Sequence, residues 1–75
     1  MGPRLAPVIW WRDTPDGREL KIAAEGRGWL ALVEGDDHEY RGKDLRLLLA
    51  DAVDADPSAP WLVALADQVE AAASG

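Results

Sequence analysis

The hydrophobic pattern of this chain changes its period once, after Gly42, and this change constrains the fold more than any other feature. In residues 18–24 every second residue is apolar, so that Leu20, Ile22 and Ala24 share one face. This pattern is typical of a half-buried strand. In residues 45–53 and 62–69 apolar side chains recur every three or four positions, which is typical of helices that pack on a core. Strands followed by helices predict an α+β fold.

The turn residues divide the chain into short elements of a single domain. We expect strands at residues 8–12, 18–24, 29–34 and 38–41 and helices at 44–55 and 59–73. Thr14 to Gly17 and Glu25 to Gly28 have the composition of tight turns, so the strands should form an antiparallel meander of three or four strands. Both helices should pack on one face of this sheet, with Asp44 or Lys43 opening the first and Ser58 as N-cap of the second.

The predicted strand at residues 29–34 is apolar on both faces, which predicts an interior strand covered on both sides. Trp10 and Trp11 are adjacent, so in a strand they point to opposite faces of the sheet. One of them is expected against the helices and the other on the free face. Trp29 and Trp61 are expected in the core, because the chain has no phenylalanine to supply bulk.

Charge is divided unevenly along the 75 residues, whose net charge is −6. All eight basic residues lie between Arg4 and Arg46, where the acids leave a net charge of −1. Residues 47–75 contain only acids and carry a net charge of −5. The helical part is therefore expected to present an acidic surface.

The residues that catalysis or metal binding would need are scarce. There is no cysteine, the single histidine is His38, and the chain has no glycine-rich phosphate loop. The acids at 51, 54 and 56 lack the glycine and glutamate spacing of a calcium loop. His38 follows two aspartates in a turn, where consecutive side chains diverge instead of converging on a metal. We therefore expect no enzyme activity, no catalytic residue, no metal and no cofactor.

Tryptophan is enriched at the energetic centres of protein interfaces, and four occur here. The leading hypothesis is a protein-interaction domain that binds a partner or itself through a sheet face around Trp10 or Trp11, with Arg12 and Lys21 at its rim. A second hypothesis is an acidic inhibitor or antitoxin-like protein that binds a basic partner through Asp51, Asp54, Asp67 and Glu70. Binding of single-stranded nucleic acid on the sheet is a third, which the net charge disfavours.

The N-terminal residues lack the apolar run of a secretory signal, and no stretch is long enough for a membrane helix. The sequence therefore predicts a cytoplasmic protein without membrane contact. Its thirteen alanines and two lysines are typical of a bacterial or phage genome rich in GC.

Residues 18–55 resemble the HicB-like antitoxin domain in the order of their elements. The resemblance rests on a strand, a reversal at Gly26-Arg27-Gly28-Trp29, a short strand ending in Gly42 and a helix rich in leucine and alanine. The proline-glycine segment of that family and a DNA-binding tail are absent. The resemblance implies a partner protein, a toxin, and no catalysis.

Overall fold

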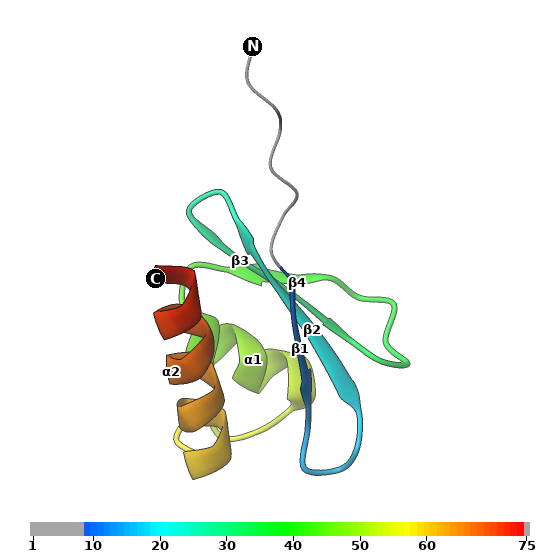
Figure 1. Ribbon diagram of the computed structural model, residues 1–75. Helices are drawn as coiled ribbons and strands as arrows, with labels where there is room; N and C mark the ends of the chain where they lie inside the picture. The colour runs from blue at the N-terminus through cyan, green and yellow to red at the C-terminus, as the bar shows by residue number, and fades with distance from the viewer. Residues whose placement is uncertain (1–8, 75) are drawn as a thin grey trace.

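The computed structural model describes residues 9–74 as four strands followed by two helices, so the predicted α+β fold is confirmed (Figure 1). The elements are β1 (Ile9–Asp13), β2 (Glu19–Glu25), β3 (Gly28–Val33), β4 (Tyr40–Gly42), α1 (Leu45–Val53) and α2 (Pro60–Ser74). Val8, the predicted first residue of β1, lies outside the described residues.

The strands form one antiparallel sheet in the order β1-β2-β3-β4, which is the predicted meander. Its register pairs Trp10 with Ile22 and Ile22 with Ala31, so these three side chains share one face. Helix α1 contacts β3 and β4, while α2 packs against α1 and lies beside β1. Both helices therefore cover the same face of the sheet, as the alternation in β2 predicts.

The core lies between this face and the helices. Six large side chains in it have almost no contact with solvent: Leu20, Ile22, Leu45, Leu49, Leu62 and Val69. Trp10, Trp29 and Trp61 are half-buried and pack against them, so the predicted core positions of Trp29 and Trp61 are confirmed. Full burial of one such aliphatic side chain stabilises a fold by about 1.5–3 kcal/mol, which makes this layer the main source of stability.

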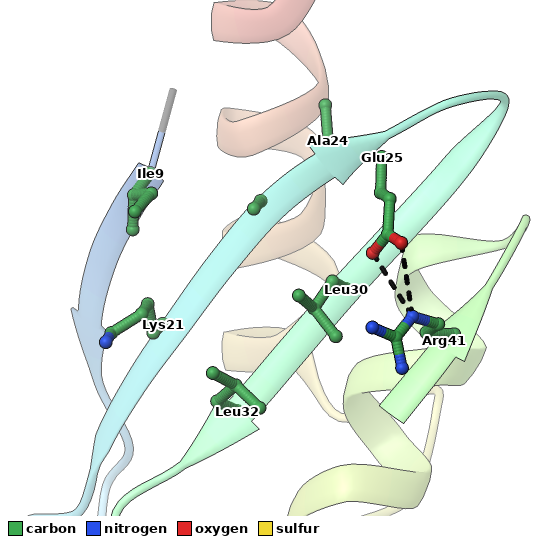
Figure 2. A pocket seen from close by; sticks show the side chains of 8 residues that line it. Ile9, Lys21, Ala24, Glu25, Leu30, Leu32 and Arg41 are labelled. Carbon is green, nitrogen blue, oxygen red and sulfur yellow. Dashed lines mark hydrogen bonds and ion pairs between the residues drawn. The ribbon is translucent and has the colours of Figure 1, made fainter. Parts of the chain in front are cut away.

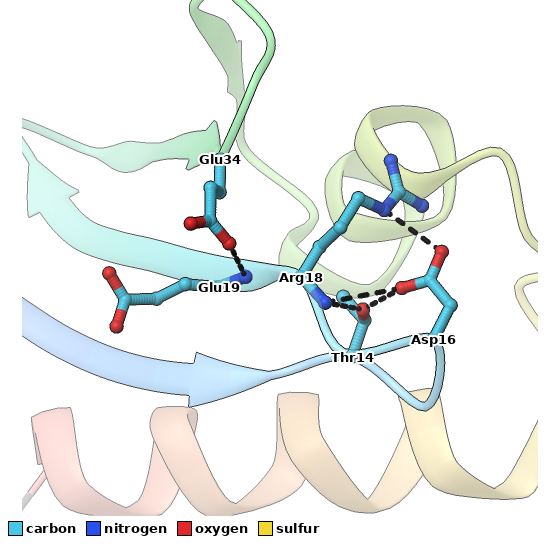
Figure 3. Close-up of polar contacts among 5 residues, drawn as sticks. All are labelled: Thr14, Asp16, Arg18, Glu19 and Glu34. Carbon is cyan, nitrogen blue, oxygen red and sulfur yellow. Dashed lines mark hydrogen bonds and ion pairs between the residues drawn. The ribbon is translucent and has the colours of Figure 1, made fainter.

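The turn between β1 and β2 is fixed by its own polar groups (Figure 3). The buried Thr14 hydroxyl donates to the Asp16 carboxylate and accepts the backbone N–H of Arg18 at 3.0 Å. The Asp16 carboxylate also lies 2.9 Å from Nε of Arg18. Gly17 takes a φ of +88° and donates its N–H to the Thr14 carbonyl at 2.9 Å. The turn predicted from Thr-Pro-Asp-Gly is therefore confirmed, with each polar residue in a defined role.

Helix α1 is capped as predicted at its start and ends earlier than predicted. Asp44 is the N-cap, and its side chain accepts the N–H of Leu47 at 3.2 Å. The helix ends at Val53 because Asp54 takes the left-handed conformation, with φ 55° and ψ 51°. The N–H of Asp54 then closes the helix by donating to the carbonyls of the last turn, including that of Ala50.

Strand β4 and helix α2 also begin later than predicted. Strand β4 begins at Tyr40 because Asp36 Oδ1 accepts the N–H of His38 at 2.9 Å, which forms a turn outside the sheet. The prediction of Ser58 as N-cap of α2 is wrong. The carbonyl of Ala59 accepts the first bonds of α2, and Ser58 instead donates its N–H to Asp56 at 2.8 Å.

Strand β3 is an interior strand, as predicted, but it is covered on one face only. Ala31 and Val33 are buried under the helices, whereas Leu30 and Leu32 point to the other side and are half-buried. Between residues 9 and 74 every helix lies on the first side. The expectation of cover on both faces is therefore wrong for the part of the chain that the structure describes.

The close approach of β3 and β4 generates a prediction. A Cβ added to Gly28 would lie 2.7 Å from the backbone oxygen of Gly42, so Gly28→Ala should force the strands apart. We expect a loss of about 1–3 kcal/mol in the free energy of unfolding, measured by urea denaturation. Gly42→Ala is the matched control, because its Cβ would meet only Leu48 Cδ1 at 3.7 Å. Equal losses in the two variants would contradict this explanation.

Candidate functional site

The uncovered side of the sheet carries an apolar surface that is not part of the core. Its side chains form two rows of cross-strand neighbours in the register of the sheet. We name it the open face, and it consists of these seven residues: Trp11, Lys21, Leu32, Ile9, Ala23, Leu30 and Arg41. Figure 2 shows the part of it around Ile9, Leu30 and Leu32. Trp11 is 50% exposed and Ile9 is 40% exposed. The exposed face of most antiparallel sheets is polar, so this one is unusually apolar.

The two cations of the open face are already partnered. Lys21 Nζ lies 4.6 Å from the centre of the Trp11 ring, a cation–π contact that contributes about 0.5–1 kcal/mol at an exposed site. Arg41 pairs with Glu39 at 2.9 Å and with Glu25 at 3.2 Å. These hydrogen bonds, first that to Glu39 and then that to Glu25, raise the pKa of the Arg41 guanidinium. The face can therefore be covered without leaving an unpaired cation.

An open hollow of about 380 Å³ lies on this face. Ile9, Leu30 and Leu32 line it with carbon, and the pair of Glu25 and Arg41 lies at its edge (Figure 2). A shallow apolar depression with charges at its edge suits an apolar side chain of another protein.

The other two sheet residues named from the sequence do not lie on the open face. Trp10 is half-buried under the helices, with its ring centre 6.1 Å from that of Trp29. Arg12 lies on the same side, beside Trp61, and donates from Nη1 to the carbonyl of Trp11 at 2.8 Å. The prediction that Arg12 lies at the rim of the free face is therefore wrong. Its guanidinium instead covers part of the backbone of the edge strand β1.

The acids of the helical part are exposed, but they do not gather in one place. Asp51 lies on α1 near enough to Tyr40 for its charge to help raise the pKa of the phenol. Asp54 is the left-handed residue that ends α1. Asp67 and Glu70 lie one turn apart on α2. Among residues 9–74, none of these four acids forms an ion pair.

His38 lies in the loop before β4 and serves a structural contact. Its ring lies edge-on to that of Tyr40, with 4.4 Å between centres. Tyr40 donates its hydroxyl to Asp36 at 2.8 Å. The hydrogen bonds from the His38 backbone and from Tyr40 lower the pKa of the Asp36 carboxyl. Within the described residues, no three histidine or acidic side chains converge as metal ligands would.

Comparison of the chain with models of protein families, with curated proteins and with solved structures found no match. No helix in the described part of the chain is both long and apolar enough to cross a membrane. The geometry of the chain's own residues therefore carries the functional argument.

Sequence reasoning missed most of the open face. The apolar residues on both faces of β3 do point to Leu30 and Leu32. The same pattern, however, also predicts a strand that is covered on both sides within the domain. Ile9 and Arg41 join the face only through the register of β1 and β4. That register is a property of strand pairing and cannot be read from the residues themselves.

The contact between Asp36 and Tyr40 predicts a shifted titration. The carboxylate accepts the phenol hydrogen, so ionisation of Tyr40 should occur with a midpoint above its ordinary value of 10.0. The contact therefore stabilises the fold below pH 10.0 and is lost as the pH rises through the higher midpoint of the folded state. Because Tyr40 is the single tyrosine, ultraviolet absorbance of the phenolate follows it directly. Asp36→Asn should lower the midpoint, whereas Asp37→Asn should not.

The left-handed backbone conformation of Asp54 indicates that the role of this residue is to end helix α1. Asp54→Gly should raise the free energy of unfolding by about 0.5–1 kcal/mol, because glycine adopts this conformation without strain. Asp51→Gly is the matched control, since it removes the same charge one turn earlier and should lower stability by about 0.3 kcal/mol. Thermal denaturation of both variants measures the difference. Stabilisation by both would instead indicate relief of charge repulsion.

Proposed function

We propose that this protein is a non-catalytic interaction domain that binds protein through the open face of its sheet. The observation that carries the proposal is the exposure of Trp11 and Ile9 beside half-buried Leu30 and Leu32, on one contiguous surface. Exposed apolar surface of this kind marks interaction sites in small proteins. Trp11 is the natural anchor, because a large aromatic side chain contributes most where an interface closes over it.

Two further observations support a protein partner. Both cations on the face have a partner within the chain, so an interface that keeps them at its solvent-exposed rim avoids the cost of burying an unpaired charge. The order of elements in residues 18–55, which resembles the HicB-like antitoxin domain, also favours a protein partner. Stacking of nucleic-acid bases has less support, since Trp11 is the one aromatic ring on this face.

A second candidate function is the binding of a basic partner by the acidic helices. It is supported by Asp51, Asp67 and Glu70, which are exposed and have no basic partner among residues 9–74. Such a partner would be steered by the net charge of −5 in residues 47–75. The separation of these acids over two helices makes this candidate the weaker one.

Site-specific photo-crosslinking distinguishes the two surfaces. A photoreactive amino acid replaces Leu32 on the open face in one variant and Asp67 on α2 in another, and each is irradiated in cells of the source organism. We expect protein adducts, with this chain or another, at position 32, and their loss when Trp11→Arg is added. Adducts confined to position 67 and lost at raised salt would overturn the open face in favour of the acidic helices.

A further inference from the structure

We infer that the occupant of the open face is a second copy of this chain, so that two sheets pack face to face with the helices on the outside. This inference rests on the proposed function and names the partner of the same surface. In such a dimer β3 is covered on both faces, by the helices on one side and by the second copy on the other. This is the environment that a strand with apolar residues on both faces favours. Sheets that pack in this way lie about 10 Å apart.

The charges on the open face favour a second copy of the chain as its partner. Lys21 and Arg41 lie in the two rows, and the acids Asp13, Glu19 and Glu25 flank them on the same side of the sheet. The face therefore carries charges of both signs and suits a partner surface that is apolar and also carries both signs. A strongly basic partner would be drawn to the helices, whose segment carries a net charge of −5. The open face of another copy meets the requirement by symmetry, since a two-fold interface pairs a surface with itself.

The surfaces elsewhere on the molecule fit this partner less well. Leu47 on α1 is the other large apolar side chain with high exposure among the described residues, and it is 50% exposed. It lies alone on a helix next to Arg46 and near Asp51, without an apolar hollow. A second copy therefore gains most contact by placing its open face on the open face of the first.

The size of the face sets the expected affinity. Three strands of five to seven residues and the three-residue β4, about 4.8 Å apart, present a surface of roughly 20 by 17 Å. Two such faces bury on the order of 1,000 Å² together, which is the lower limit for a specific interface. The dimer should therefore be weak, with a dissociation constant on the order of 10–100 µM, and it should form only at raised protein concentration.

Salt should strengthen this dimer. Each copy carries a net charge of −6, so two copies repel at long range, and screening reduces that repulsion. The apolar contacts themselves are not weakened by salt. A complex held by the acidic helices and a basic partner would respond in the opposite direction.

Sedimentation equilibrium of the full chain tests the inference, from about 5 to about 500 µM, at low and at raised salt. We expect a monomer–dimer equilibrium that shifts towards dimer as salt is added. Trp11→Arg and Leu32→Arg should each weaken it at least tenfold, or about 1.4 kcal/mol. Leu47→Arg is the matched control, because it replaces a side chain as exposed as Trp11 with the same cation and should leave the dimer intact. Circular dichroism verifies that each variant is folded.

The outcomes separate this inference from the proposed function. A wild-type chain that stays monomeric to the highest concentration at raised salt, or a dimer that Leu47→Arg weakens as much as Trp11→Arg, overturns the second copy as occupant. If position 32 still forms adducts with another protein in that case, the open face remains an interaction surface with a different partner. If neither dimer nor adduct forms, both proposals are wrong.

Discussion

The packing of both helices against one face of β2 and β3 is the interaction on which the rest of this structure depends. Leu20 and Ile22 of β2 and the helix residues Leu49 and Leu62 are fully buried in this single layer. A chain of this size has enough apolar residues for one such layer, since small domains bury only about 60% of their surface. With two helices on one side, nothing between residues 9 and 74 is left to cover the other. The open face is thus a consequence of the architecture, and its apolar character is what needs a functional reason.

The sequence predicted the elements, their order and the single helix-covered face, because these follow from hydrophobic period and turn composition. It also placed Trp29 and Trp61 correctly, because a core without phenylalanine needs their bulk. It could not decide between Trp10 and Trp11, since adjacent strand residues point to opposite faces and only the register shows which of the two lies under the helices. The ends of elements were missed where local hydrogen bonds decide them. The Asp36 side chain accepts a backbone N–H before β4, and the backbone N–H of the left-handed Asp54 closes α1. Such bonds have energies of about 1 kcal/mol, which is too little to leave a periodic signal.

The two halves of the chain use their acids differently. In the sheet half, Asp16 and Asp36 accept hydrogen bonds that hold turns, which lower the pKa of both carboxyls, and Glu25 pairs with Arg41. In the helical half, Asp51, Asp67 and Glu70 have no such partners within the described residues. Acids near the C-terminal end of a helix are mildly unfavourable because of its dipole. The helical acids therefore contribute net charge and repulsion between copies, whereas the sheet acids contribute structure.

The apolar residues of the open face contribute little to the stability of the single chain and would contribute more to association. Trp11 is half exposed in the single chain, so it gains only part of the stabilisation that full burial would supply. Selection for folding alone would tolerate a polar residue there, as the wet face of an ordinary antiparallel sheet does. Covering the face, by contrast, would complete the burial of Leu30 and Leu32 together with that of Trp11. The side chains that contribute least to the single domain are thus those that would gain most from a bound partner, and this asymmetry supports the proposal that the open face binds protein.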